Sequence, residues 1–242
     1  MRIAVLTTET PHHAHFVAAL SAASQSVVAI VEPGGVTSAY ETHHPFEDAR
    51  SEYERQRWFD GRRRAISDFA ESHVVDDINR ATGLLRAAQA DLVIVFGTRI
   101  IRGDLLHAHP QMFNLHGGDP RTYRGSDTHL WAIWHREFGE LKTCLHNVTD
   151  VLDGGSIAGI RPIPIKRDME LHQLRAANTE VCISLVKDAV EELGKMGRIQ
   201  TERQHAAGRT YSFMPSVLKG VCVTRFRQHT KRLDDGLRSS VA

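Results

Sequence analysis

The chain has 242 residues, of which 41% are hydrophobic, and its 30 Lys and Arg balance 29 Asp and Glu to give a formal net charge of +1. This length allows one large domain, or one domain with a small appendage. The balanced charge gives no support to a nucleic-acid or anionic-membrane binder, which usually has a basic excess, and no apolar run approaches the roughly 20 residues of a membrane span.

The N-terminus and the cysteines predict a cytoplasmic protein. The apolar part of residues 1–6 is too short for a signal peptide and lacks a cleavage site. The three cysteines, Cys144, Cys182 and Cys222, are far apart and form no Cys-x-x-Cys pair. That spacing favours reduced thiols and argues against a zinc cluster.

The first thirty residues predict a βαβ unit. Residues 2–6 form an apolar run typical of a buried strand, residues 12–23 have helical spacing, and residues 27–31 form a second strand. Such units build open parallel sheets, whose ligands bind at the carboxyl ends of the strands. The loop at residues 7–13 is therefore expected to face a ligand.

That loop lacks a Gly-x-Gly-x-x-Gly sequence, which disfavours a dinucleotide cofactor. Its adjacent histidines point in different directions on a helix and have no carboxylate or cysteine partner at ligand spacing, so no metal site is expected. Contact with a substrate at the helix N-terminus is favoured instead. The candidates are Thr8, Thr10, His12 and His13.

The middle of the chain continues the alternation of strands and helices. Residues 91–96 (DLVIVF) are the clearest strand, and their unbroken apolar run indicates that both faces are covered. The other expected elements are a surface loop at 32–47, one or two amphipathic helices over 48–71, a short apolar segment at 74–78, helices at 79–89, 105–109 and 130–134, and strands at 112–115 and 141–146.

The later elements end the main domain, taken as residues 1–197. A strand over 157–165 is broken by Pro162 and Pro164, which favours an edge position. A long amphipathic helix over 171–193 is stopped by Gly194 and Gly197. Residues 198–242 form an extension: 211–215 and 221–226 read as short strands of a hairpin, and 228–242 as a frayed tail.

One stretch, residues 113–157, holds an amide, two imidazoles and a carboxylate. Asn114 and His116 come first, Tyr123-Arg124-Gly125 follows, and His146 precedes Asp153-Gly154-Gly155. Proton transfer at a carbonyl centre needs such a set.

The stretch resembles the active-site region of the folate-dependent formyltransferases. Their pattern is Asn-x-His, a Tyr/Phe-Arg/Lys-Gly element, a helix with Trp-Ala-Ile, then Thr-x-x-His and, seven residues later, Asp-x-Gly. The matching residues here are Asn114, His116, Tyr123-Arg124-Gly125, Trp131-Ala132-Ile133, Thr143, His146 and Asp153-Gly154-Gly155. The resemblance covers residues 90–165 well and the rest in outline. It implies an α/β fold: a Rossmann-like open, mostly parallel sheet with helices on both faces.

The resemblance implies Asn114, His116 and Asp153 as the catalytic group and 10-formyltetrahydrofolate as the formyl donor. The amide of Asn114 suits the negative oxygen of a tetrahedral intermediate, and imidazole is a natural proton shuttle. His146 orients Asp153, touches substrate, or is only structural; the sequence leaves these open. The implied folate contacts are Arg99, Ile100, Ile101, Val148, Thr149, Asp150 and Asp153, and Tyr123, Arg124 and His146 join the candidate substrate contacts.

The acceptor is predicted by elimination within the family. Relatives acting on glycinamide ribonucleotide carry a phosphate loop at residues 7–13, and those acting on tRNA carry a large C-terminal domain; neither feature is visible here. Where many relatives have Ser-Leu-Leu-Pro, this chain has Gly117-Gly118-Asp119-Pro120. The remaining resemblance is to sugar-nucleotide N-formyltransferases, of the dTDP-4-amino-4,6-dideoxy-sugar type, acting as homodimers.

Four alternatives stay open. They are a formyltetrahydrofolate hydrolase, a phosphoribosylglycinamide-type formyltransferase, a catalytically silent folate or nucleotide binder, and a metal hydrolase built on His12, His13, His116 and His146.

Overall fold

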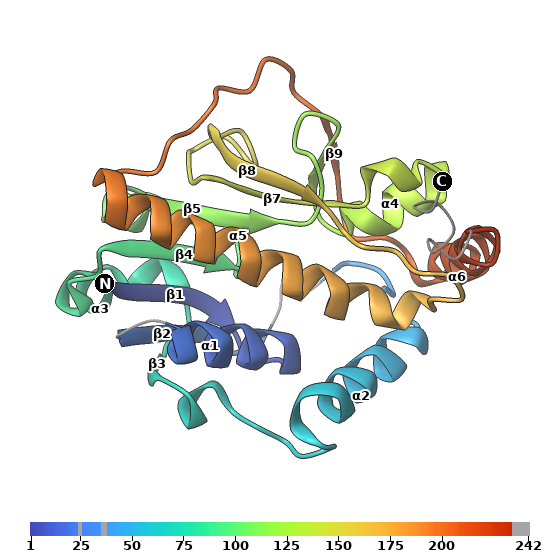
Figure 1. The fold of residues 1–242 in the computed structure, drawn as a ribbon, viewed down its shortest axis with the longest axis horizontal. Coiled ribbons are helices and arrows are strands. Elements are labelled where there is room, and N and C mark those ends of the chain that lie inside the picture. Colours follow the sequence, from blue (N-terminus) through green and yellow to red (C-terminus); the bar gives the residue numbers. More distant parts are fainter. Residues whose placement is uncertain (24–25, 35–37, 234–242) are drawn as a thin grey trace, which may run out of the picture.

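The computed structural model describes residues 1–23, 26–34 and 38–233, and its centre is a seven-stranded sheet of order β3-β2-β1-β4-β5-β7-β8 (Figure 1). Strands β1 to β5 pair in parallel, whereas β7 is antiparallel to both of its neighbours. The strands are β1 (Arg2–Thr8), β2 (Ser26–Glu32), β3 (Glu71–Val74), β4 (Leu92–Phe96), β5 (Met112–His116), β7 (Lys142–Asn147) and β8 (Ile157–Pro162). The predicted open, mostly parallel sheet and the edge position of β8 are confirmed.

Helices cover both faces of the sheet, as its unbroken apolar strands require. Ile3 and Val5 of β1 pack with α1 (Pro11–Ala23) and α5 (Leu174–Met196), while Ala4 and Leu6 pack with α3 (Thr82–Ala88). Figure 1 shows α1 and α5 side by side across one face. Successive strand residues point to opposite faces, so β1 contributes to both halves of the core.

The segment between β2 and β4 differs from its predicted form. One helix, α2 (Phe46–Phe59), replaces the one or two expected over 48–71, because Asp60 and Gly61 both take positive φ and end it. The chain then runs through a short 3-10 turn to β3. This strand ends at Val74, where the expected apolar segment 74–78 begins. The helix expected over 79–89 is shortened to α3 by a 3-10 turn at Ile78–Arg80, and that expected over 105–109 is a 3-10 helix, Gly103–His107.

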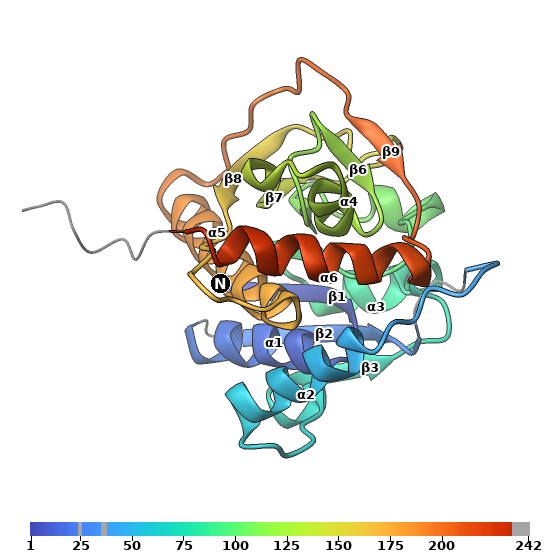
Figure 2. The ribbon, with the colours of Figure 1, turned by 90° about the vertical axis from the view of Figure 1, so that its right-hand side faces the viewer.

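The hairpin predicted in the C-terminal segment is wrong. Residues 221–226 lie inside α6 (Ser216–Thr230), where Cys222 and Phe226, one helical turn apart, are fully buried against α4 (Thr128–His135). β9 (Arg209–Tyr211) instead pairs in parallel with β6 (Tyr123–Gly125) in a separate small sheet. Figure 2 looks onto α6, which crosses the molecule between α4 and α2.

The C-terminal segment folds back over the first 197 residues, and the division of the chain at residue 197 stays a prediction. The predicted frayed tail begins inside α6, and its residues 234–242 lie outside the described residues. Within the described ranges, no helix has the length and apolar character needed to cross a membrane.

Candidate active site

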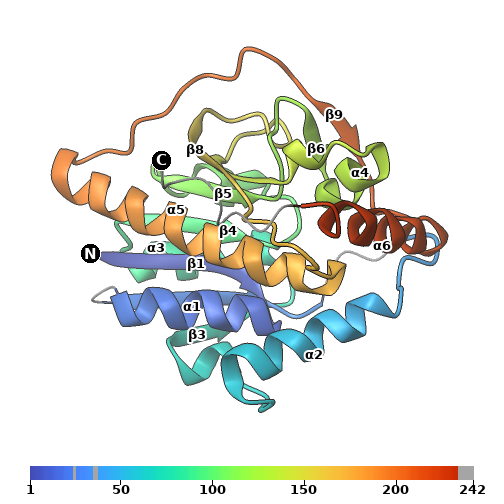
Figure 3. The same cartoon turned by 45° about the vertical axis from the view of Figure 1, so that its right-hand side comes forward.

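A cavity of about 620 Å³ lies at the carboxyl ends of β4 and β5. Its walls come from the segments that follow these strands, from the loop between β7 and β8, and from α2 and α5. Figure 3 shows the parallel strands pointing toward the side of the molecule where α2, α4 and α6 gather. This is where an open α/β sheet is expected to bind its ligand.

Four polar side chains meet in this cavity: Asn114, His116, His146 and Asp153. Asn114 of β5 is directly opposite His146 of β7 in the sheet, and Asn114 Nδ2 lies 3.2 Å from His146 Nε2. Asp153 Oδ1 is 3.4 Å from His146 Nε2, and its Oδ2 is 3.5 Å from His116 Nδ1. The structure therefore brings together the predicted catalytic group and the histidine whose role the sequence left open.

Backbone contacts define which ring nitrogen of each histidine carries a proton. His116 Nε2 is 2.8 Å from the Tyr123 carbonyl, which can only accept, so neutral His116 has its lone pair on Nδ1, facing Asp153. His146 Nδ1 donates in the same way to the Asn147 carbonyl, and its Nε2 lies 3.2 Å from the Asn114 amide nitrogen and 3.4 Å from Asp153 Oδ1. The Asn114 amide has two N–H groups, of which His146 can engage at most one, so one is left for a ligand.

The charge states of His116 and Asp153 follow from their burial and their contacts. Burial lowers the pKa of His116, although the nearby Asp153 carboxylate opposes that shift, so the imidazole is neutral at pH 7. Burial alone would raise the pKa of Asp153, but His146, His116 and the Gly125 N–H outweigh it and hold the pKa below its ordinary value. A neutral base next to an ionised carboxylate is the result.

Gly125 allows the close approach that holds Asp153. Its N–H donates to Asp153 Oδ2 at 2.8 Å, and its φ of 90° lies in the region that favours glycine. A Cβ at this position would stand 2.1 Å from the Tyr211 carbonyl oxygen of β9. The Tyr-Arg-Gly element therefore acts on the site through its backbone.

Gln204, which the sequence did not reveal, clamps the turn that carries Asp153. Its side-chain amide donates to the carbonyls of Asp153 at 2.8 Å and Gly155 at 2.7 Å, and accepts from Arg124 at 2.6 Å. Arg124 also donates to the Pro120 carbonyl at 2.8 Å, which ties in the loop after His116. No sequence motif marks Gln204, because it contacts its partners across 51 positions of chain.

Replacement of Gln204 by Leu is expected to lower kcat roughly tenfold, because the Asp153 turn loses two backbone contacts and small displacements of a catalytic group are costly. The matched control is Gln200→Leu on the exposed side of the same segment. Steady-state kinetics separate the outcomes: a positioning role lowers kcat at unchanged donor KM, whereas equal kinetics in both variants would contradict the clamp.

At one end the cavity has apolar side chains that are open to solvent. Ile100, Val151 and Leu152 line it and are 47%, 53% and 38% exposed. Glu32, itself fully buried, holds this end by contacting Arg99 Nε at 2.5 Å and accepting from the Ile78 N–H at 3.2 Å. Of the implied folate contacts, Arg99, Ile100, Ile101, Val148, Thr149 and Asp153 line the cavity, and Asp150 does not.

The candidate substrate contacts of the first loop are largely occupied by one another. Thr8 Oγ1 is 3.0 Å from His13 Nδ1, and Thr10 Oγ1 is 2.8 Å from His12 Nδ1. Burial lowers the pKa of His13 to about 3, and its ring stands where a Cβ of Gly97 would be. His12 lines the cavity, whereas Thr8, Thr10 and His13 do not.

Tyr123 and Arg124 also stand behind the cavity wall. The Tyr123 hydroxyl donates to Glu137 at 2.5 Å, and its ring stacks on Tyr211. Neither residue lines the cavity, while Tyr211 does. Their side chains therefore support the site from outside the cavity.

Two further observations bear on other chemistries. Cys144, Cys182 and Cys222 are free and buried, and burial raises the pKa of each thiol, so none is a ready nucleophile. Across the described part of the chain, no group of three or more His, Cys, Asp and Glu side chains is arranged to hold a metal ion.

Comparison with solved structures finds the same fold. Rv3404c from Mycobacterium tuberculosis, a candidate sugar N-formyltransferase, superposes with a TM-score of 0.60 at 15% identity over 88% of this chain and 75% of its own. HypX from Aquifex aeolicus, in complex with tetrahydrofolic acid, gives 0.57 at 17% identity over 98% and 35%, so this chain spans about a third of it. Glycinamide ribonucleotide transformylase 1 from Symbiobacterium toebii gives 0.54 at 18% identity over 84% and 93%.

A search of curated protein sequences gives no match. The sequence profile of the formyl transferase family, by contrast, matches residues 1–189. That match includes every residue of the Asn114, His116, His146 and Asp153 cluster. The chain belongs to the formyl transferase family.

Proposed function

We propose that the protein is an N-formyltransferase that moves the formyl group of 10-formyltetrahydrofolate to the primary amine of a nucleotide-linked amino-sugar. The observation that carries the proposal is the cluster of Asn114, His116, His146 and Asp153 inside one cavity. An amide donor, a neutral imidazole and an ionised carboxylate there meet the needs of acyl transfer to an amine.

Asn114, His116 and Asp153 each have a separate role in the proposed reaction. As the amine nitrogen bonds to the formyl carbon, the free N–H of Asn114 donates to the oxygen that gains negative charge. His116 takes the amine proton on Nδ1 and returns it to the folate nitrogen when the bond from that nitrogen to the formyl carbon breaks. Asp153 stays ionised and stabilises the imidazolium at 3.5 Å. Protons balance, since the amine loses one and the folate nitrogen gains one.

The apolar end of the cavity suits the flat pterin ring of the donor. Exposed Ile100, Val151 and Leu152 offer a slot of hydrophobic side chains next to Asp153, and large exposed hydrophobics grouped in a cavity mark a ligand site. The structurally similar HypX was solved with tetrahydrofolic acid, and the N-formyltransferase from Helicobacter canadensis, with a TM-score of 0.55 at 13% identity over 88% of this chain and 71% of its own, with folinic acid.

Two observations support a sugar nucleotide as the acceptor. The Helicobacter canadensis enzyme was also solved with dTDP-3-aminofucose, which supports a sugar nucleotide. In this chain Thr8 and Thr10 contact His13 and His12, and neither threonine lines the cavity, so they are poorly placed to bind a ribonucleotide phosphate. This argues against the glycinamide-ribonucleotide alternative.

A homodimer stays part of the proposal. The apolar C-terminal residues form a helix and not strands, and that helix exposes Val217 and Val221. Light scattering of the full chain measures the oligomeric state directly.

The test of the function is calorimetry with folinic acid present and a panel of dTDP- and UDP-linked 3- and 4-amino-sugars as titrants, followed by a formyl-transfer assay. Binding of folinic acid and of one amino-sugar nucleotide, with formylation of its amine, is the expected result. Folinic acid binding without any sugar nucleotide would leave formyl transfer and remove the acceptor class. No binding of folinic acid would remove the proposed donor.

A further inference from the structure

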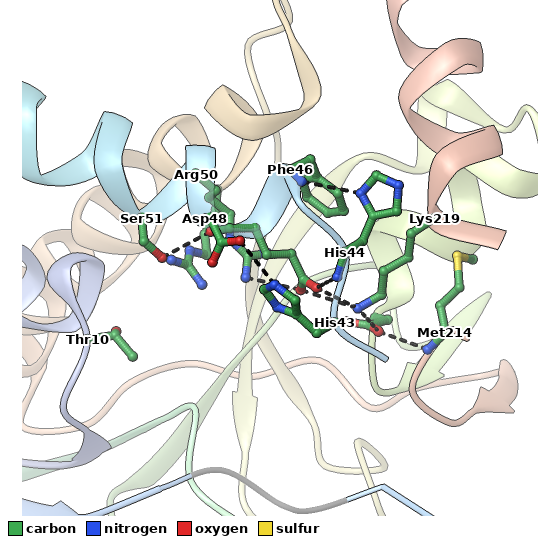
Figure 4. Close-up of polar contacts among 12 residues, drawn as sticks. Thr10, His43, His44, Phe46, Asp48, Arg50, Ser51, Met214 and Lys219 are labelled. Carbon is green, nitrogen blue, oxygen red and sulfur yellow. Dashed lines mark hydrogen bonds and ion pairs between the residues drawn. The ribbon is translucent and has the colours of Figure 1, made fainter. Parts of the chain in front are cut away.

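The cavity also takes part of its lining from residues outside both the catalytic cluster and the exposed apolar slot. It is lined by Phe46 and Arg50 of α2, by Arg175 of α5 and by Phe213 of the C-terminal segment. Figure 4 shows the side chains of Phe46 and Arg50 leaving α2 beside Lys219, which reaches across from α6. Two arginines that the donor slot does not include therefore line the cavity.

These two arginines differ in how their charge is balanced. Arg175 donates through Nε and a terminal nitrogen to both oxygens of Glu54, at 2.7 Å each, and Glu54 is fully buried. That fork-to-fork pair uses the carboxylate completely. Arg175 is thus a charge whose partner is built into the protein.

Arg50 is balanced poorly. A guanidinium has five N–H donors, yet among residues 1–23, 26–34 and 38–233 its one hydrogen bond runs to Glu47 Oε1 at 3.3 Å. Its Nε is buried and has no hydrogen-bond partner within the same ranges. Glu47 is also shared, since it accepts from Lys219 Nζ at 3.2 Å through each oxygen.

Asp127, a carboxylate that does line the cavity, is also engaged. Asp127 accepts from the Met214 N–H at 2.8 Å and lies 3.6 Å from Lys219 Nζ. Burial and the neighbouring Arg175 cation lower the pKa of Arg50 to about 10. Glu47, Glu54 and Asp127 oppose that shift without cancelling it. A partly buried cation that lines a cavity, with few hydrogen bonds and another cation nearby, is stabilised by an anion that enters from outside.

We propose that Arg50 is the anchor for an anionic group of the acceptor, a phosphate such as those of a nucleoside diphosphate. The proposal rests on the acyl-transfer function proposed above and assigns an acceptor contact in that cavity. A planar, always-charged fork suits phosphate oxygens, which can take two parallel N–H bonds. Phe46, whose ring lies 5.6 Å from the Arg50 guanidinium carbon, and Phe213 also line the cavity and offer apolar surface to the rest of the same molecule.

The experiment compares wild type with Arg50→Gln, Arg50→Lys and the matched control Arg57→Gln, an exposed arginine on the same helix. Calorimetry uses inorganic pyrophosphate, thymidine diphosphate and malonate as separate titrants, and folinic acid as an independent probe of the donor end. Thermal unfolding shows whether each variant is folded.

We expect pyrophosphate and thymidine diphosphate to bind wild type and Arg57→Gln alike, at least tenfold more weakly to Arg50→Gln, and with intermediate affinity to Arg50→Lys, which keeps the charge but not the fork. Folinic acid should bind all four proteins equally. Should malonate alone show this Arg50 dependence, the anchor takes a carboxylate, and the phosphate assignment is overturned.

Equal diphosphate binding by wild type, Arg50→Gln and Arg50→Lys, or no anion binding by wild type, would also overturn the proposal. In either case, folinic acid binding and formyl transfer would keep the wider function intact. If wild type does not bind folinic acid but binds diphosphate in an Arg50-dependent way, the result would support Arg50 as the phosphate anchor and would contradict the proposed formyl donor.

Discussion

Replacement of His116 by Ala or of Asp153 by Asn is expected to lower kcat by on the order of a hundredfold or more, because the first change removes the proton acceptor and the second removes the carboxylate that stabilises its protonated form. In the proposed mechanism His116 Nδ1 is the base, and Asp153, 3.5 Å away, is the carboxylate that stabilises its protonated form. Asn tolerates the positive φ of 50° that Asp153 adopts, so the second change keeps the backbone turn. Single-turnover kinetics with saturating donor measure the effect.

The pH profile separates this mechanism from a structural effect. Because burial lowers the pKa of His116, the acid limb of the wild-type kcat/KM profile should have its midpoint below 6.5, with activity rising as the imidazole loses its proton. The Asp153 carboxylate raises that pKa, so Asp153→Asn should move the limb to lower pH. A folded Asp153→Asn variant with near-normal turnover and an unmoved acid limb would refute the assignment.

Replacement of Lys219 by Met is expected to lower the free energy of unfolding by roughly 2–4 kcal/mol, because it breaks a buried charge cluster from one side. Lys219 is only 3% exposed and lies within 3.2 Å of Glu47 and 3.6 Å of Asp127, so α2 and the start of α4 are both joined to α6 through it. Denaturant unfolding followed by circular dichroism gives the change.

Lys187→Met on the exposed face of α5 is the control, since that lysine is solvent-accessible. Its expected change in unfolding free energy is within about 0.5 kcal/mol. If both substitutions have the same small effect, Lys219 does not hold α6 in place.

The sheet was predictable because its strands are continuous apolar runs. Residues 91–96 and 2–6 carry β-branched side chains that pack on both faces, and the chain offers no competing pattern there. The segment 221–226 has a similar composition but became a helix, because Cys222 and Phe226 find a buried surface on α4 only at helical spacing. Tertiary packing thus overrides local propensity in short apolar segments.

The catalytic group was predictable for a different reason. Asn114, His116, His146 and Asp153 lie within one stretch whose spacings resemble those of a known family, and the structure brings them together. Gln204, Glu32 and Arg50 were missed because each acts through partners distant in sequence or through burial. Arg50 lies in a helix of charged residues that sequence patterns indicate as a solvated face.

The clamp by Gln204 and the ion pairs of Lys219 have a consequence for biosynthesis. A ribosome delivers the chain from its N-terminus, and domains fold as they emerge. All of the matched family segment, residues 1–189, is made before Gln204 and Lys219 appear. The strands of the central sheet can therefore pair before the clamp exists, and we expect the turn that carries Asp153 to take its final geometry only after Gln204 has left the exit tunnel.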